Sequence, residues 1–245
     1  MTMPEDRVEP CAGIVMPAFN EEPTLQTAIE RVLASPWCAE LIVVDDGSTD
    51  RTLEIAHKIE ASDPRVRVLE QGRNQGKGAA LRRGIQEVSA PIVIVQDADL
   101  EYDPADYGAL IAPILEDNAD VVYGSRFSSP GPHRVLYFWH SVGNKLLTTV
   151  SNAVTNLNLT DMETCYKAFR REVIQSIELE EDRFGFEPEV TAKVARLGAR
   201  IYEVGISYAG RTYAEGKKIG WRDGVRALVC IAKYSPLGER VRSRR

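Results

Sequence analysis

The chain has 245 residues, 44% hydrophobic and 27% charged, with a formal net charge of −6. This composition is typical of a soluble globular protein with one large core, and it excludes a disordered chain, a collagen and a disulfide-rich scaffold. No apolar run approaches the roughly 20 residues of a membrane-spanning helix, and the N-terminus does not resemble a secretory signal. The four cysteines are far apart, without a Cys-x-x-Cys pair, which favours reduced thiols over a zinc site and predicts a cytoplasmic protein.

Charge is distributed unevenly along the chain. Residues 211–245 hold ten Lys or Arg and three Asp or Glu, a net charge of +7, which leaves −13 for residues 1–210. The basic end can be read as a solubilising, frayed terminus, or as a contact with anionic lipid headgroups or with the phosphates of a ligand. We expect no nucleic-acid partner, and the sequence leaves the oligomeric state open.

Short apolar runs alternate with amphipathic stretches over the first half of the chain. The pattern predicts strands at 13–16, 41–44, 66–69, 92–95 and 121–123, and helices at 22–34, 51–61, 78–88 and 104–116. Buried strands with helical crossovers indicate an α/β fold, in which residues 12–125 form a mainly parallel, doubly wound sheet. Ligands bind beyond the carboxyl ends of the strands in such sheets, so the residues after each strand are the candidates for a site.

The regular alternation of apolar runs and amphipathic stretches ends after Gly124. The pattern there predicts a loop at 128–132, a long helix at 135–155, a short segment at 161–169, a helix at 187–197, extended pieces at 200–204 and 206–209, and a helix at 221–234. No repeat or low-complexity linker divides the chain. We therefore predict one domain with a C-terminal helical elaboration.

The strongest local signal follows the fourth predicted strand, where Asp97, Ala98, Asp99, Leu100 and Glu101 come in succession. Asp97 and Asp99 can reach a common point if the chain turns there, with Glu101 as a third oxygen donor. Crowded carboxylates repel one another unless a cation neutralises them, and hard oxygen ligands select Mg²⁺ or Mn²⁺. Because Mg²⁺ binds through one or two carboxylates plus substrate phosphates, the pattern predicts a phosphorylated ligand. The alternative is a solvated loop.

Two further segments lie at expected strand or helix ends. Asp46 follows the second strand, where a carboxylate is suited to accept hydrogen bonds from a ribose or a base. The same stretch could instead be a helix start capped by Ser48 or Thr49. Lys77, between two glycines at the head of the third helix, allows close backbone approach and a cation near a diphosphate. The spacing around it fits neither a Walker A loop nor a dinucleotide fingerprint.

Together these motifs resemble family 2 glycosyltransferases of the GT-A fold, in the group of dolichyl-phosphate mannose synthases and polyprenyl-phosphate glycosyltransferases. Seven motifs carry the resemblance in chain order: 15–21, 45–50, 74–78, 97–99, 124–127, 161–164 and 210–213. The resemblance covers about residues 13–234. It implies a single GT-A domain at 12–235, with a nucleotide-binding half at 12–125 and an acceptor-side half at 126–235, followed by a basic tail at 236–245.

The resemblance also implies roles for individual residues. Those expected to bind the nucleotide, the diphosphate or the metal are Pro17, Phe19, Glu21, Val44, Asp46, Lys77, Asp97, Ala98, Asp99, Glu101, Arg126, Arg211 and Lys217. Among them Asp97, Asp99 and Glu101 would bind Mg²⁺ or Mn²⁺, while Arg211 and Lys217 would lie on a loop that closes over the donor. Asp99, Asp161 and Arg211 are the expected catalytic residues.

The implied activity is an inverting, metal-dependent transfer of a hexose from a UDP- or GDP-sugar to a polyprenyl or dolichyl phosphate. A lipid phosphate is already ionised and attacks unaided, whereas a saccharide or other soluble hydroxyl acceptor needs a general base. Asp161 and Glu163 are the candidates for that base. Asp161 could instead cap the following segment, and Glu163 could be an ion-pair partner.

Two alternatives to this activity remain open at the level of sequence. One keeps the donor and uses a soluble hydroxyl acceptor. The other is an inactive nucleotide-sugar-binding module, against which the intact residues Asp97, Asp99, Arg211 and Lys217 argue. For a lipid acceptor we expect a cytoplasmic protein that can lie on the inner face of the membrane. The aromatic-rich helix at 135–155 could meet that surface, or Leu136, Trp139 and Leu146 could be ordinary core residues.

Overall fold

The computed structural model describes residues 9–128, 135, 137–210 and 221–235. The first half alternates strands and helices: β1 Ala12–Ala18, α1 Leu25–Leu33, β2 Cys38–Asp45, α2 Thr52–Glu60, β3 Val66–Glu70, α3 Lys77–Glu87, β4 Ile92–Val95, a 3₁₀ turn η1 Pro104–Asp106, α4 Tyr107–Leu115 and β5 Val121–Ser125. Every strand and helix predicted for this half is confirmed. The predicted helix at 22–34 starts later, at Leu25, because the residues before it form a turn.

The second half contains α5 Phe138–Thr155, β6 Lys167–Arg170, α6 Arg171–Gln175, α7 Phe186–Arg196, β7 Ile201–Gly205 and α8 Trp221–Tyr234. The prediction for α8 matches its observed bounds. The short helix α6 was not predicted. The extended piece expected at 206–209 is not a strand, and only an isolated bridge between Tyr208 and Tyr102 forms there.

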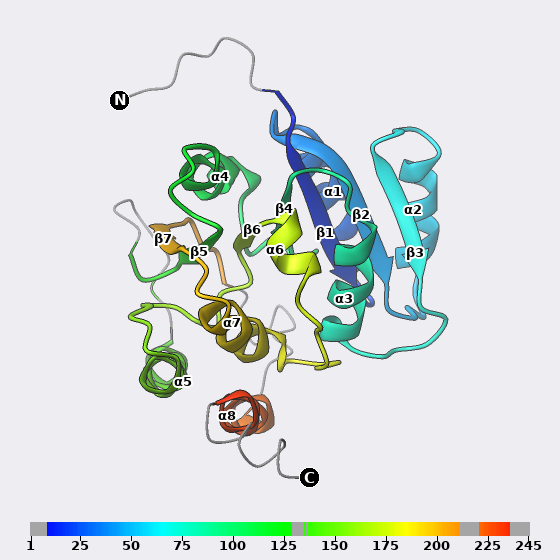
Figure 1. Ribbon diagram of the computed structural model, residues 1–245. Coiled ribbons are helices and arrows are strands. Elements are labelled where there is room, and N and C mark those ends of the chain that lie inside the picture. Colours follow the sequence, from blue (N-terminus) through cyan, green and yellow to red (C-terminus); the bar gives the residue numbers. More distant parts are fainter. Residues whose placement is uncertain (1–8, 129–134, 136, 211–220, 236–245) are drawn as a thin grey trace.

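The seven strands form one sheet in the order β3-β2-β1-β4-β6-β5-β7. Six strands run in the same direction: β1–β2, β2–β3, β1–β4 and β5–β7 are parallel pairs. Only β6 runs antiparallel to its two neighbours, β4 and β5. The sheet is therefore mainly parallel, as predicted. In Figure 1, α4 lies on one side of this sheet, and α5, α7 and α8 lie together on the other.

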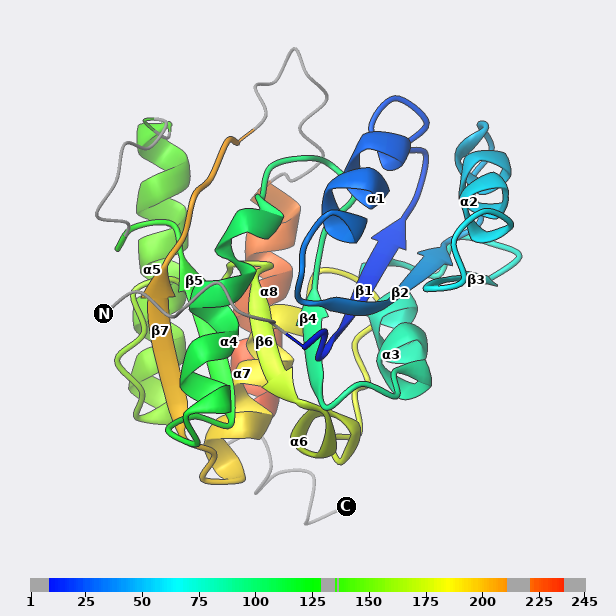
Figure 2. The same ribbon diagram turned by 90° about the horizontal axis from the view of Figure 1, so that it is seen from above.

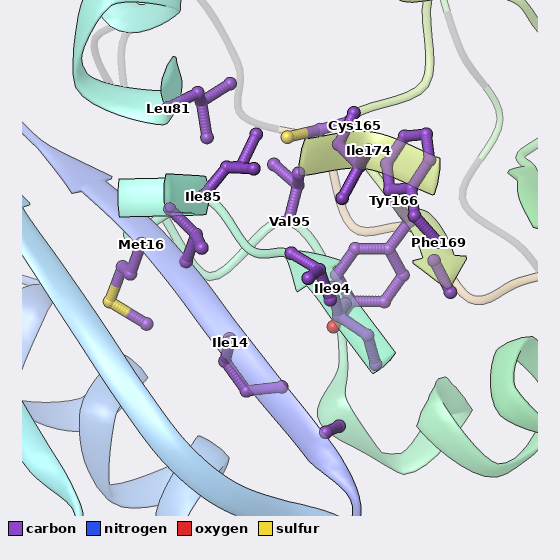
Figure 3. Close-up of a cluster of buried hydrophobic side chains, with 14 of the residues drawn as sticks. Ile14, Met16, Leu81, Ile85, Ile94, Val95, Cys165, Tyr166, Phe169 and Ile174 are labelled. Atoms are coloured by element: carbon purple, nitrogen blue, oxygen red, sulfur yellow. The ribbon is translucent and has the colours of Figure 1, made fainter. Parts of the chain in front are cut away.

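One hydrophobic core joins the two halves of the chain. Ile14 and Met16 of β1, Leu81 and Ile85 of α3, and Ile94 and Val95 of β4 lie near Tyr166, Phe169 and Ile174 from the region around β6 and α6 (Figure 3). The strands are rich in Val and Ile, whose branched side chains favour a pleated, buried surface. Burying such side chains contributes roughly 1.5–3 kcal/mol each. This shared core fixes the strand ends that carry the candidate site.

The helices α5 and α8 lie side by side, away from the strands β1 and β2 (Figures 1 and 2). Trp139 and Leu146 of α5 are 78% and 56% exposed, so the interpretation of these two residues as core is wrong. Leu136 lies outside the described residues. No helix in the described part of the chain is both long and apolar enough to cross a membrane.

Candidate active site

Lys77 and Asp97 form an ion pair where β4 ends and α3 begins. The Lys77 Nζ lies 3.0 Å from Asp97 Oδ1, 3.1 Å from the Cys165 Sγ and 3.4 Å from Glu187 Oε1. Burial acts to lower the pKa of Lys77, but the negative charges around it outweigh burial and hold that pKa well above its usual value. Lys77 is therefore a permanent cation whose first partner is the predicted metal ligand Asp97.

The chain turns sharply after Asp97, as a shared carboxylate site requires. Leu100 has φ of 65°, and Asp99 Oδ1 accepts a hydrogen bond of 3.1 Å from the Glu101 backbone N–H. Ala98 is buried. The Glu101 carboxylate accepts a hydrogen bond of 2.7 Å from the Tyr208 hydroxyl. In the described residues no three His, Cys, Asp or Glu side chains are arranged to hold a metal, so the three-ligand set stays a prediction.

Asp46, at the end of β2, organises the loop that follows β3. One of its carboxylate oxygens accepts hydrogen bonds from Gln71 Nε2 and the Gln75 N–H, at 2.8 and 2.7 Å, and the other accepts one of 2.8 Å from the Gly76 N–H. Asp46 is almost fully buried by this loop. The structure thus gives Asp46 a local structural role, and its predicted contact with a nucleotide stays a prediction.

The loops after β1 and β2 are hydrogen-bonded to each other. The Ser48 hydroxyl accepts a bond of 3.0 Å from the Asn20 N–H, and the Thr49 N–H donates one of 2.8 Å to Asn20 Oδ1. The interpretation of Ser48 or Thr49 as a helix cap is wrong, because α2 starts later and Arg51 occupies its N-cap position. These side chains instead hold two strand ends together.

The other predicted nucleotide-pocket residues occupy this same edge of the sheet. Pro17 and Phe19 are partly buried at the end of β1, and Glu21 is buried with its Oε2 accepting a 2.9 Å bond from the Thr24 hydroxyl. Val44 is fully buried, and a Cβ added to Gly84 of α3 would lie 3.0 Å from its side chain. No part of Val44 is exposed at this edge, and its predicted contact with a nucleotide stays a prediction.

The amino end of α3 is covered by the protein's own chain. The Ala79 N–H donates a bond of 3.0 Å to the Asp182 carbonyl, and a Cβ on Gly78 would lie 2.2 Å from the Glu181 carbonyl oxygen. Gly76 has φ of 107° and approaches Asp182 equally closely. The glycines thus allow a close approach, and the group that lies against them is the backbone at 181–183. A diphosphate near Lys77 stays a prediction.

A second ion pair lies where β5 ends. Arg126 binds Asp161 through two parallel bonds, Nε to Oδ2 at 2.6 Å and Nη2 to Oδ1 at 2.8 Å. Asn144 of α5 donates a further bond of 3.1 Å to Asp161 Oδ1. Burial acts to raise the pKa of Asp161, but Arg126 outweighs burial and lowers it. This pairing favours an ionised anchor over the predicted general base, and it leaves Asp161 no capping role.

Four buried polar side chains that we did not predict form a cluster at the end of β4. Gln96 Oε1, directly before Asp97, accepts bonds from the Tyr107 and Tyr166 hydroxyls, at 2.8 and 2.5 Å. Tyr102 stacks on Tyr166 with a centroid distance of 4.6 Å. A polar residue at the end of an apolar strand was the available signal for Gln96. The tyrosines gave no local signal, because their partner is far away in the sequence.

Glu163 lies in the segment that leads from Asp161 to Cys165. Its Oε1 is sealed from solvent and has no hydrogen-bond partner in the described part of the chain, which contradicts the ion-pair interpretation. The neighbouring cation, Lys167, donates instead to the Met162 and Thr164 carbonyls. Burial and the nearby Glu187 raise the pKa of Glu163 to about 8. The predicted phosphate-binding residues Arg211 and Lys217 lie outside the described residues.

Comparison with known proteins assigns the fold and the family. Residues 13–178 match the sequence model described as "Glycosyl transferase family 2", which is more than half of the chain. The chain belongs to glycosyltransferase family 2. It is therefore an inverting glycosyltransferase, and the predicted resemblance is confirmed.

Individual relatives of this family 2 enzyme cover most of its length. It is 31% identical over 230 residues to the undecaprenyl-phosphate mannosyltransferase of Micrococcus luteus, covering 90% of this chain and 92% of that protein. It is 28% identical over 244 residues to the polyprenol monophosphomannose synthase of Mycolicibacterium smegmatis, covering 94% and 89%. A solved structure, glucosyl-3-phosphoglycerate synthase from Mycobacterium tuberculosis in complex with Mn²⁺, UDP and phosphoglyceric acid, superimposes with a TM-score of 0.70 and 23% identity over 91% of this chain and 78% of that one. This likeness confirms the GT-A fold.

Proposed function

We propose that this enzyme transfers a hexose from a UDP- or GDP-sugar to a polyprenyl phosphate. The observation that carries the proposal is the state of Asp161, which Arg126 binds through both carboxylate oxygens and keeps ionised. A base held in this way is poorly placed to take a proton from a hydroxyl, whereas a phosphate acceptor needs no base. The names of the relatives from Micrococcus luteus and Mycolicibacterium smegmatis support the same acceptor class.

On the donor side, Asp97 and Asp99 supply hard oxygen atoms on one turn, which fits Mg²⁺ or Mn²⁺ together with substrate phosphates. When bound there, such a cation would stabilise the charge on the departing nucleoside diphosphate. Lys77 fixes the orientation of Asp97 at 3.0 Å and adds a positive charge beside it. The Tyr208 hydroxyl holds Glu101 at the other end of the turn. These contacts position the carboxylates before the donor arrives.

We further propose that α5 places the enzyme on the membrane surface. Phe138, Val142 and Leu146 recur at intervals of four residues on one side of the helix and are exposed, with Trp139 beside them. The opposite side turns Asn144 to the Arg126–Asp161 pair. Aromatic and aliphatic side chains on one face of a helix are typical of insertion at a lipid interface. A lipid bound there would lie across α5 from the Arg126–Asp161 pair.

Liposome flotation tests the membrane proposal. Trp139→Ser with Phe138→Ser is expected to lower the bound fraction on phospholipid vesicles at least about threefold, because apolar area no longer enters the lipid. Leu197→Ser, at another exposed position on the far end of α7, is the matched control and should float like the wild type. Equal flotation of all three proteins would contradict the assignment of α5.

Partition of labelled sugar tests the reaction itself. We would incubate the enzyme with UDP- and GDP-hexoses, Mn²⁺ or Mg²⁺, and farnesyl phosphate, and then extract with organic solvent. Label in the organic phase is the expected result. Label only in new water-soluble saccharides would favour the second candidate, a hydroxyl acceptor. Glu163, with a pKa near 8, is the residue that could act as base for that reaction.

A further inference from the structure

The segment 161–165 connects the two ion pairs of the site. At one end Asp161 binds Arg126, and at the other the Cys165 Sγ lies 3.1 Å from the Lys77 Nζ. The backbone between them is fixed from two sides, since the Met162 N–H donates to the Thr148 hydroxyl of α5 and the Cys165 N–H to the Tyr102 hydroxyl. Glu163 occupies the middle of this segment. Its backbone therefore lies between the predicted donor end and the predicted acceptor end of the site.

Charged groups surround Glu163 without forming a bond to its Oε1. They are Glu187 from α7, Lys167 from β6, Arg126 after β5 and Asp161 in its own segment. Arg126 is bound to Asp161, and Lys167 donates to two backbone carbonyls. A buried polar atom without a partner costs about 1–3 kcal/mol. Such an atom beside a site indicates a group that a ligand completes.

The protonation state of Glu163 limits what that ligand can be. Burial, and secondly Glu187, raise its pKa to about 8, while Lys167 and Arg126 act in the opposite direction. The carboxyl group is therefore mostly neutral at pH 7 and can donate a hydrogen bond as well as accept one. An ionised carboxylate here would repel a phosphate, whereas a neutral carboxyl group can bind one of its oxygens.

We propose that Glu163 is an acceptor-binding residue whose neutral carboxyl group donates a hydrogen bond to a non-bridging oxygen of the acceptor phosphate. This inference rests on the proposed function and assigns a specific residue to its acceptor. In the reaction, an acceptor phosphate oxygen forms the new bond to the anomeric carbon as the bond from that carbon to the nucleoside diphosphate breaks. Glu163 keeps its proton throughout and orients the attacking phosphate.

The pH dependence of the acceptor KM tests this role. With farnesyl phosphate as acceptor, the wild-type KM is expected to rise about tenfold between pH 7 and pH 9, as the fraction of neutral carboxyl falls. In Glu163→Gln the amide still donates but does not titrate, so KM should be about threefold higher at pH 7 and then constant. Glu172→Gln, on the exposed side of α6, is the control and should follow the wild type.

Other outcomes of the same measurement overturn the inference. An equal rise of KM in the wild type and in Glu163→Gln would mean that the Glu163 carboxyl group does not contact the acceptor and binds at most a water molecule. If wild-type kcat instead increases through pH 8 and Glu163→Gln loses at least about 100-fold in kcat, Glu163 is a general base.

Direct binding separates this inference from the proposed function. Titration calorimetry of farnesyl phosphate into the full chain, without donor, should give a Kd that weakens about tenfold from pH 7 to pH 9 in the wild type but not in Glu163→Gln. If that binding behaves as expected while no sugar reaches the lipid, the proposed transfer fails and the role of Glu163 stands. If transfer occurs but binding shows no difference between the two proteins, the role of Glu163 fails alone.

Discussion

The two ion pairs of the site differ in how deeply they are buried and in how many bonds hold them. Lys77 and Asp97 keep 17% and 21% of their side-chain surface exposed, and Lys77 shares its charge among three neighbours. Asp161 is fully buried and held by two parallel bonds from Arg126. A lysine ammonium is a compact charge that can exchange partners, whereas a bidentate arginine fixes both distance and direction. The comparison indicates an adjustable pair at the proposed donor end and a rigid pair at the proposed acceptor end.

The largest expected effect comes from breaking the rigid pair. Arg126→Met leaves Asp161 buried without its counter-ion, which is expected to lower the free energy of unfolding by about 3–5 kcal/mol. Arg67→Met, which removes an exposed pair with Glu87, should cost no more than about 1 kcal/mol. Urea unfolding measures both values. Similar losses of unfolding free energy in the two variants would mean that the Arg126–Asp161 pair does not stabilise the fold more than an exposed ion pair does.

Removing Asp161 as well tests whether the loss in Arg126→Met comes from the unpaired buried charge. The double variant Arg126→Met with Asp161→Leu no longer buries an unpaired charge, so it should regain part of the stability lost in Arg126→Met. Losses that simply add in the double variant would show that the two side chains act independently.

At the adjustable end we expect loss of turnover with little loss of stability. Asp97→Asn and Asp99→Asn should each lower kcat at least about 100-fold, the scale for removal of a main electrostatic stabiliser. Asp103→Asn, at an exposed cap just beyond the turn, is the matched control, because asparagine also caps. Sugar transfer and urea unfolding should be measured on the same preparations. Near wild-type turnover in both site variants would defeat their assignment as metal ligands.

The smallest expected effect is on stability at Glu163. A carboxyl group whose pKa is raised from 4.5 to about 8 binds its proton more tightly in the folded state. Its contribution to the free energy of unfolding therefore falls as pH rises from 4.5 to about 8 and is constant above that. Glu163→Gln does not titrate, so its stability relative to the wild type should increase by at least about 1 kcal/mol between pH 5 and pH 8. A constant difference over that window would contradict the raised pKa.

Elements with a local pattern could be predicted from the sequence. The run Ile92–Val95 is uniformly apolar, and the helical pattern of Trp221–Tyr234 gives the observed bounds of α8. Those patterns depend only on neighbouring residues, so no tertiary information is needed to read them. The carboxylates after β4 could be placed at a strand end for the same reason.

Long-range pairings could not be predicted in this way. Asp161 was a candidate base for a hydroxyl acceptor, because nothing nearby in the sequence shows that Arg126, 35 residues away, binds it. The glycines at the start of α3 suggested a ligand, yet their neighbour is the backbone near Asp182, about 100 residues later. The contacts of a site thus depend on which distant segment the fold brings there. The local pattern identifies reactive groups and not their partners.

The reversed strand β6 has a consequence for how this site can change. Ile94 of β4 pairs with Ala168 and Ile92 with Arg170, so the beginning of β6 lies beside the end of β4. The residues that enter β6 and those that leave β4 therefore meet at one edge, although Gln96 and Tyr166 are 70 residues apart and belong to separate loops. Under the proposed function, substitutions before β6 would change the acceptor side of the site while the turn at Asp97–Glu101 stays intact. A few substitutions in the segment before β6 would thus be enough to change the acceptor, while the residues proposed to bind the donor sugar stay the same.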